Sequence, residues 1–256
     1  MFFEFFGAST KNIEAVYLFS TSHVVAIFTI IAFTVIISQL FRKPQLEKYR
    51  VIFRYTFFFV FLVEEILYKI WRIAIFHSPI RENLSLNLCA ITIILLMIVL
   101  INKNERLFEL TYFWGLAGAT QAILTPDIGQ YGFPHFRFFQ FFLSHGSIVA
   151  VVVFLTVVEG LKPKKGSIKR VFIMTNAYAL VIFLVNYILG TNYLFISRKP
   201  VTASALDLLG PWPWYILSLE GIALVLFVIM YSPFIISKFV QKKDDNITHS
   251  IEQYNQ

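Results

Sequence analysis

The feature that most constrains this chain is a series of long apolar stretches joined by short charged connections. A helix needs about 20 mostly apolar residues to cross a bilayer. Seven stretches come close to that length or exceed it: 23–40, 51–76, 84–101, 107–124, 136–158, 171–189 and 214–238. Irregular backbone is unfavourable in lipid, because its polar groups would lack partners. We therefore expect an all-α polytopic transmembrane bundle of about seven spans.

Composition supports a membrane protein. Apolar residues make up 57% of the 256 residues and charged residues 14%, whereas soluble domains contain about 25% charged residues. A water-soluble fold of this size could not bury that much apolar surface. The N-terminus has neither a basic region nor a small-residue cleavage motif, so we expect no cleaved signal peptide. We expect a multi-pass protein of the cell membrane with membrane phospholipid as its partner.

The basic residues predict the orientation of the spans. Those expected on one side of the membrane are Arg42, Lys43, Lys48, Arg50, Lys103, Arg106, Lys162, Lys164, Lys165, Lys169, Arg170, Lys238, Lys242 and Lys243. The other side has only Lys11, Arg81, Arg198 and Lys199. By the positive-inside rule the first side is cytoplasmic, which puts the N-terminus outside and the C-terminus inside. Basic residues in short membrane-flanking runs also argue against a nucleic-acid partner.

We expect one domain, because the connections are short and no repeat or linker interrupts the series. Residues 1–240 form the predicted transmembrane domain, and 241–256 form a short polar cytoplasmic tail that we expect to be disordered. The single cysteine excludes an internal disulfide and a cysteine-based zinc site. We expect no metal or soluble cofactor.

The span 136–158 carries a polar stripe. Arg137, Gln140, Phe141, Ser144 and His145 recur at helical spacing, so they share one face. A single histidine within a membrane often only makes a packing hydrogen bond. Several polar groups on one face instead favour a lined cavity, in the half of the membrane nearer the outside.

The span 51–76 carries charges. Glu65, Lys69 and Arg72 lie on one helical face, and Glu64 begins a neighbouring stripe. Charges inside a membrane are expensive unless they pair or face water. One interpretation is an internally neutralised ion-pair ladder that holds helices together. The other is an outer-leaflet pocket for a phosphate or carboxylate.

The only cysteine lies in the span 84–101. Ser85, Cys89 and Thr92 are predicted to share a helical face. A membrane cysteine is usually a small apolar packing residue. The alternative is a nucleophile, for which His145 is the candidate base.

Four segments resemble a known family: LSLNLCA (84–90), YFWGLAGATQAILTPD (112–127), FPHFRFFQFFLSHG (133–146) and ALDLLGPWPWYIL (205–217). The chain resembles the YwaF-like bacterial integral membrane proteins, which are related to a vertebrate cysteine-dependent acyltransferase of ether phospholipids. The resemblance implies catalysis by Cys89 and His145. One position departs from the family pattern: Asn87 stands where a histidine usually precedes the cysteine by two residues. An asparagine can replace a hydrogen-bonding histidine but not a catalytic one.

Two hypotheses follow. In the first, the protein is a lipid acyltransferase or acyl hydrolase acting on outer-leaflet phospholipid, with Cys89 as nucleophile and His145 as base. The predicted substrate-binding residues are Arg72, Lys69, Glu65, Asn87, Trp114, Arg137, Gln140 and Ser144. Arg137 or Arg72 would hold the phosphate, and Asn87 or Trp114 would orient the oxyanion. In the second, the same polar stripes line a path or pocket in a non-enzymatic transporter or binding protein for lipid or small solutes.

Overall fold

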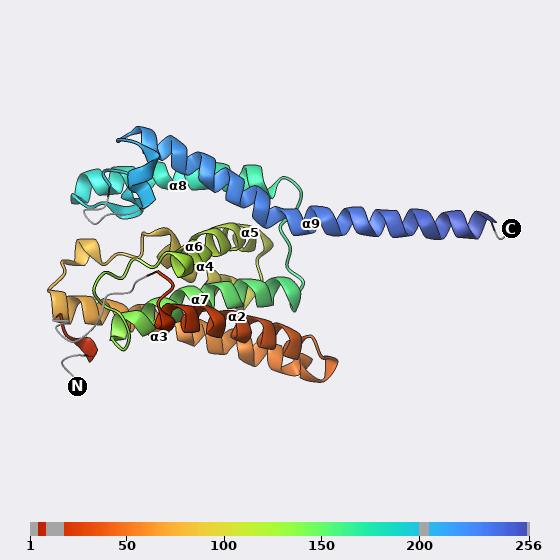
Figure 1. Ribbon diagram of the computed structural model, residues 1–256, viewed down its shortest axis with the longest axis horizontal. Coiled ribbons are helices and arrows are strands. Elements are labelled where there is room, and N and C mark those ends of the chain that lie inside the picture. Colours follow the sequence, from red (N-terminus) through yellow and green to blue (C-terminus); the bar gives the residue numbers. More distant parts are fainter. Residues whose placement is uncertain (1–4, 9–17, 200–204, 255–256) are drawn as a thin grey trace.

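The computed structural model describes residues 5–8, 18–199 and 205–254, and the regular structure in those ranges is entirely helical. The long helices are α2 (Thr21–Phe41), α3 (Arg50–Phe76), α4 (Leu88–Asn102), α5 (Glu105–Trp114), α7 (Phe136–Val157), α8 (Ser167–Leu189) and α9 (Trp214–Tyr254). The short elements are η1 (Pro44–Tyr49), η2 (Ile80–Glu82), η3 (Gly115–Ala119), α6 (Thr120–Leu124), η4 (Tyr193–Phe195) and η5 (Ala205–Leu209). Helices α2 and α3 pack on α7, the α4–α6 segment lies in the middle, and α8 and α9 form the opposite side (Figure 1).

Four described segments are long and apolar enough to cross a bilayer: Thr21–Phe41, Phe136–Val157, Ser167–Leu189 and Trp214–Ser237. This finding confirms a helical membrane protein. Helix α3 is also long but carries charges, α4 has only 15 residues, and the run from α5 to α6 is divided by η3. The count of seven spans and the orientation stay predictions.

One predicted boundary is wrong where it matters most. We expected a helix from residue 84, but α4 begins at Leu88, because Asn87 has an extended backbone conformation. Asparagine is a preferred residue just before a helix. Ser85 therefore lies in the preceding loop, and the predicted stripe of Ser85, Cys89 and Thr92 does not exist. Cys89 becomes the second residue of α4.

Helix α9 differs from prediction at its other end. Its backbone continues helical to Tyr254, through residues that we expected to be disordered. Within its membrane segment, Pro233 cannot donate a hydrogen bond to the Ile229 carbonyl. The hydroxyl of Ser232 donates to that carbonyl instead, at 2.7 Å. This replacement explains how α9 continues past a proline in an environment without water.

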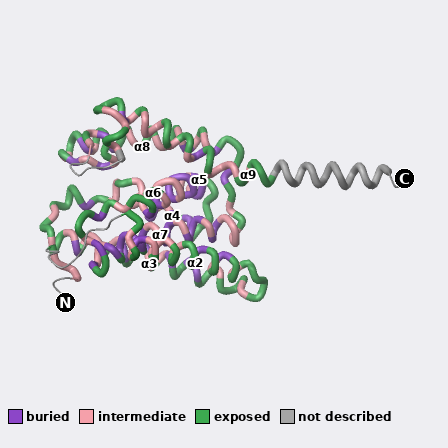
Figure 2. The backbone as a smooth tube through the Cα atoms, viewed as in Figure 1, coloured by how far each residue is buried: buried purple, intermediate pink, exposed green. Residues whose placement is uncertain are grey.

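Helix α7 is the central element. Ile148, Val151 and Phe154 are fully buried, and Figure 2 shows the buried backbone concentrated in α7 and the neighbouring α5. By contrast, large apolar side chains of α8 are exposed, including Tyr187 at 85%. Exposed apolar residues around a buried helix are the pattern that a lipid solvent permits. Most of α7 is thus held by neighbouring helices, with Phe139 and Leu143 on its exposed face, so its polar stripe has a defined position.

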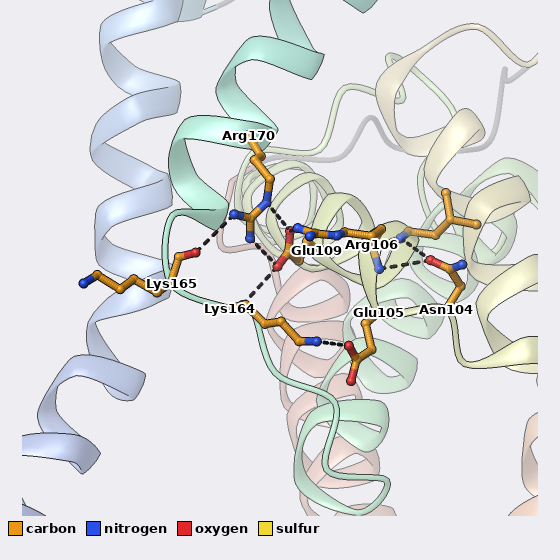
Figure 3. A network of polar contacts seen from close by, with 8 residues as sticks. Asn104, Glu105, Arg106, Glu109, Lys164, Lys165 and Arg170 are labelled. Atoms are coloured by element: carbon orange, nitrogen blue, oxygen red, sulfur yellow. Dashed lines mark hydrogen bonds and ion pairs between the residues drawn. The ribbon is translucent and has the colours of Figure 1, made fainter.

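The predicted cytoplasmic end is closed by a polar network around Glu109 of α5 (Figure 3). The Glu109 carboxylate accepts hydrogen bonds from Arg170 Nη2 at 2.7 Å and Nε at 3.0 Å. It also accepts from the backbone N–H of Lys164 at 3.1 Å. The side chain of Lys164 pairs with Glu105. These contacts join α5, the loop after α7 and the start of α8.

Removing the arginine of this network should destabilise the protein. In an Arg170→Ala variant the Glu109 carboxylate, only 3% exposed, would lose its bidentate partner. Two charge-assisted hydrogen bonds would be lost while Arg106, at 3.7 Å, and the Lys164 N–H stay in place, so we expect a loss of about 2 kcal/mol of stability. Thermal unfolding in detergent measures it. Lys169→Ala removes the same charge from an exposed neighbour and is the control; equal midpoints for both variants would contradict the prediction.

A second stability prediction concerns His135, which precedes α7 and is fully buried. Its Nδ1 accepts a hydrogen bond from the Arg137 backbone N–H at 3.0 Å, so Nε2 carries the proton and donates to the Gly7 carbonyl at 3.1 Å. Burial, aided by the positive charge of Arg137 and opposed by the hydrogen bond to Gly7, lowers the pKa of His135 below its ordinary value.

The sign of the pH effect follows from this shift. As pH falls through about 6.5, the unfolded chain takes up the His135 proton before the folded protein does, so stability falls. We expect the unfolding midpoint of the wild type to drop more between pH 7 and pH 5 than that of a His135→Asn variant, in which asparagine still caps the helix. Parallel pH profiles for the two proteins would refute this role of His135.

Candidate functional site: a polar cavity around Cys89

A cavity of about 590 Å³ lies between the α3, α4 and α7 side of the protein and the α8–α9 pair. We call it the central cavity. Its polar lining residues are Glu64, Glu65, Tyr68, Asn87, Cys89, Trp114, Gln121, Asp127, Arg137, Gln140, Ser144, His145, Thr175, Tyr178 and Glu220. Its apolar wall includes Ile93, Ile216, Leu219 and Phe227. A pocket with mostly apolar walls and a few converging polar groups is typical of a ligand site.

A second hollow, of about 780 Å³, lies between α2 and α7. Its lining is almost entirely apolar. It includes Val25 and Phe33 of α2, side chains of α3, and Phe138 and Phe142 of α7. Among the described residues that line it there is no charged side chain, histidine or cysteine. It faces away from the polar stripe of α7, so the chemistry of the chain gathers in the central cavity.

Cys89 is half-buried and lies in the first turn of α4, where backbone N–H groups have no acceptor within the helix. The first hydrogen bond of the helix runs from Ile91 N–H to the Asn87 carbonyl. The N–H groups of Leu88, Cys89 and Ala90 therefore have no acceptor within the helix. Free N–H groups and the helix dipole favour negative charge at this end. They are suited to stabilise a thiolate or an oxyanion beside Cys89.

A π-helical turn, η3, brings a glycine next to the thiol. A Cβ atom added at Gly118 would lie 3.4 Å from Cys89 Sγ. On the same turn, a Cβ at Gly115 would lie 2.9 Å from the side chain of Ile148 on α7. Short π-helical segments inside helices are frequent at functional sites. Gly115 thus allows the turn to pack closely against α7, and Gly118 leaves room for the sulfur of Cys89.

His145 has a defined ring orientation. Its Nδ1 lies 2.8 Å from the Phe141 carbonyl one turn earlier on α7. A carbonyl only accepts, so Nδ1 carries the proton of the neutral ring and Nε2 keeps its lone pair. The Phe141 ring lies against the imidazole at an interplanar angle of 37°, with centroids 4.2 Å apart. The arrangement leaves Nε2 as the proton-accepting atom of the ring.

A hydrogen-bonded chain runs inward from Arg137. The Arg137 guanidinium donates to Gln140 Oε1, and Gln140 Nε2 donates to Glu64 Oε1. The guanidinium also lies over the rings of Tyr68 and Phe141, at 4.8 and 5.2 Å from their centroids. These cation–π contacts hold a charge that remains available to an anion.

Glu64 is the exceptional member of this chain. It is only 6% exposed, and its second oxygen, Oε2, has no hydrogen-bond partner among the described residues. Leaving a buried polar atom unpaired costs about 1–3 kcal/mol. Because this atom lies at the wall of a cavity, we expect a molecule bound in the cavity to donate a hydrogen bond to it.

The charged residues on one face of α3 have two different roles: some line the central cavity and others hold neighbouring segments together. Glu65 pairs with Lys69 at 3.1 Å, and Ser85 bridges the two side chains. Arg72 donates to the Glu82 carbonyl at 2.9 Å. Glu65 lines the central cavity, whereas Lys69 and Arg72 are not among its lining residues. The ion-pair interpretation thus accounts for Glu65 and Lys69.

The two side chains considered for oxyanion binding are both engaged. Trp114 Nε1 donates to Thr175 Oγ1 at 2.8 Å, which joins η3 to α8 and occupies the indole N–H. Asn87 Oδ1 accepts from the Leu194 N–H at 3.2 Å and ties the start of α4 to η4. The side chains of both residues line the cavity. The backbone N–H groups of α4 are better placed for an oxyanion than the indole.

Filling the space beside the thiol should protect it. In Gly118→Val the new side chain would contact Sγ, so we expect a small maleimide to label Cys89 about tenfold more slowly than in the wild type, because thiol reactivity depends on access. Gly221→Val is the matched control, since a Cβ there meets nothing within 4 Å. Unchanged labelling in a folded Gly118→Val protein would mean that the cavity does not lead to the thiol past this glycine.

Sequence reasoning missed three parts of the site. Glu64 was assigned only to a stripe beside the ion pairs, Gly118 was not among the predicted site residues, and the position of Cys89 in a first helical turn was obscured by the wrong start of α4. Asn87 was the available signal for that start, because asparagine favours the position before a helix. Asp127, which no prediction included, is exposed and lines the central cavity.

These features define an all-helical membrane protein with a polar cavity around a half-buried cysteine. The chain belongs to the TMEM164 family, whose family model matches residues 18–231. An uncharacterized protein of Treponema pallidum (strain Nichols) is 31% identical over 157 residues, which are 60% of this chain. The match covers 63% of that relative, slightly less than two thirds of its length. No solved structure matches the chain.

Proposed function

We propose that this protein is a membrane-embedded lipid acyltransferase or acyl hydrolase that uses Cys89 and His145 on outer-leaflet phospholipid. The observation that carries the proposal is that the thiol, the imidazole and the stacked Arg137 guanidinium line one cavity with an apolar wall. A phospholipid offers matching parts: an anionic phosphate, an ester carbonyl and apolar chains. The four sequence segments that resemble the YwaF-like proteins add support, because that family is related to a vertebrate acyltransferase.

The first half of the reaction forms a thioester. Nε2 of His145 takes the thiol proton while Cys89 Sγ attacks the ester carbonyl carbon. The carbonyl oxygen becomes an oxyanion, which the free N–H groups at the start of α4 stabilise. The carbon–oxygen ester bond then breaks, and His145 returns the proton to the leaving lysolipid oxygen. Arg137 holds the phosphate.

The second half releases the acyl chain. A lipid hydroxyl, or water, gives its proton to His145 and attacks the thioester carbonyl. The carbon–sulfur bond breaks, and His145 protonates the departing thiolate. Transfer yields a new ester and hydrolysis yields a fatty acid; both regenerate the starting thiol and imidazole.

Detection of the thioester tests the proposal. Purified protein in lipid nanodiscs is incubated with a phospholipid whose acyl chain carries an alkyne tag, and the tag is followed on the protein by mass spectrometry. We expect a hydroxylamine-sensitive acyl group on Cys89 and one released lysolipid per acylated protein. A folded protein that forms neither, yet is stabilised against heat by lipid or a small solute, would favour the non-enzymatic transporter or binding protein.

A further inference from the structure

The unpaired oxygen of Glu64 points to a function that the catalytic pair does not supply. Glu64 Oε1 is held by the Gln140 amide, whose own oxygen is held by Arg137. The orientation of the amide is therefore fixed, and Glu64 Oε2 has no partner at hydrogen-bond geometry in the described part of the chain, although the Ser144 hydroxyl on α7 interacts with the carboxyl. The residue is almost wholly buried yet lines the central cavity.

Among the residues that the structure describes, no cation forms an ion pair with Glu64. Lys69 is occupied by Glu65 and Ser85, and Arg72 by the Glu82 carbonyl. Arg137 reaches Glu64 only through the Gln140 amide. Glu64 is thus not a member of the α3 ion pair, although it is next to Glu65 in sequence.

The chemistry of an unpaired carboxyl oxygen selects its ligand. Such an oxygen in a carboxylate can only accept a hydrogen bond. Ester carbonyls and phosphate oxygens lack a proton to donate, so the ester and phosphate groups of the acyl donor do not satisfy it. The acyl acceptor does, because a lysolipid or water brings an O–H group into the cavity.

We propose that Glu64 Oε2 accepts a hydrogen bond from the hydroxyl group that receives the acyl chain, so that Glu64 binds the acceptor in the cavity before the reaction. The inference rests on the proposed function. The hydroxyl has one proton, so its hydrogen bond turns from Glu64 Oε2 to His145 Nε2 as the hydroxyl attacks. The hydroxyl oxygen then forms the new ester bond to the thioester carbon, the carbon–sulfur bond breaks, and the proton passes through His145 to sulfur. Glu64 orients the attacking hydroxyl and is left unchanged.

A binding experiment tests this step without turnover. The full chain in nanodiscs is titrated with lysophosphatidylcholine and with an analogue in which hydrogen replaces the free hydroxyl; the choline headgroup has no N–H donor. We expect the wild type to bind the hydroxyl form about tenfold more tightly, the worth of one good hydrogen bond to a charged group. A Glu64→Leu variant should bind both lipids equally. Equal affinities in the wild type, or a preference kept by Glu64→Leu, would overturn the proposal.

A kinetic experiment tests the same residue during the reaction. Protein acylated on Cys89 is mixed with lysophosphatidylcholine, and loss of the thioester is followed. We expect Glu64→Gln, which keeps the side-chain size, to form the thioester at the wild-type rate but to transfer the acyl chain at least about tenfold more slowly. Glu105→Gln, at the far end of the bundle, is the control. Equal transfer rates for wild type and Glu64→Gln would refute the assignment.

The two experiments separate the inference from the function on which it rests. If the wild type forms no thioester, the proposal of acyl transfer is wrong. The preference for the hydroxyl lipid in the binding experiment then still decides whether Glu64 recognises a lipid hydroxyl. If the thioester forms but no hydroxyl preference is found, acyl transfer stands and Glu64 is excluded. Unfolding midpoints of both Glu64 variants establish that the compared proteins are folded.

Discussion

A Cys89→Ala variant should lose phospholipid turnover entirely within the sensitivity of the assay, a fall of at least about a thousandfold. Loss of the nucleophile removes the covalent pathway, and the cavity alone can only bind and orient the lipid. Labelled phospholipid supplied in nanodiscs, with lysolipid and free fatty acid as products, measures the effect. The substitution is small and the residue is half-buried, so the protein should stay folded.

Cys89→Ser adds a sharper comparison. The hydroxyl keeps the shape of the thiol but is a weaker nucleophile at neutral pH. We expect slow turnover or none, with the acyl group held as a hydroxylamine-resistant oxygen ester if it forms. Turnover in Cys89→Ala equal to that of the wild type would mean that another group performs the chemistry, and the catalytic proposal would fall.

A His145→Ala variant should lower turnover by about a hundred- to ten-thousandfold, the range for a lost general base and acid. The reason is the orientation of the ring, whose Nδ1 is used by the Phe141 carbonyl and whose Nε2 is therefore the only base it offers. The same nanodisc assay measures the loss. Thioester formation should slow as well, because both halves of the reaction pass a proton through this ring.

The control for His145 must separate catalysis from packing. His145→Asn can still donate a hydrogen bond to the Phe141 carbonyl but offers no base in place of Nε2. We expect its unfolding midpoint to lie near that of the wild type while its turnover matches His145→Ala. If His145→Asn retains wild-type turnover, the histidine serves structure and another base acts on the thiol.

Local patterns predicted much of the helical framework. The stretches 51–76, 136–158 and 171–189 correspond to α3, α7 and α8 within a few residues at each end, because lipid demands helical backbone wherever the side chains are apolar. The stripe on α7 was predicted by the same periodicity, and Arg137, Gln140, Phe141, Ser144 and His145 all line the central cavity. Helix phase is a local property, so residues three and four apart suffice to define it.

Other features depended on contacts between distant segments. The expected span began at residue 84 because the apolar pattern continues through residues 84–87, and only Asn87 indicated locally that α4 begins at Leu88. In the structure this segment is held by Tyr193, whose hydroxyl accepts from the Leu84 N–H, and by Tyr178, whose hydroxyl donates to the Leu86 carbonyl. Both tyrosines come from the far half of the chain. The consequence for Cys89, a place in the first turn, was therefore decided by tertiary contacts.

By itself the sequence determined that this protein is helical, belongs in a membrane and carries polar groups on one face of its central span, because solvent and helix period act residue by residue. Only the tertiary structure decided which of these groups share a cavity. Glu65 and Glu64 are neighbours in sequence, yet one is paired with Lys69 and the other has an unpaired oxygen at the cavity wall. That difference depends on Gln140, 76 residues away in the chain, and pairing across such a separation is set by packing rather than by local pattern.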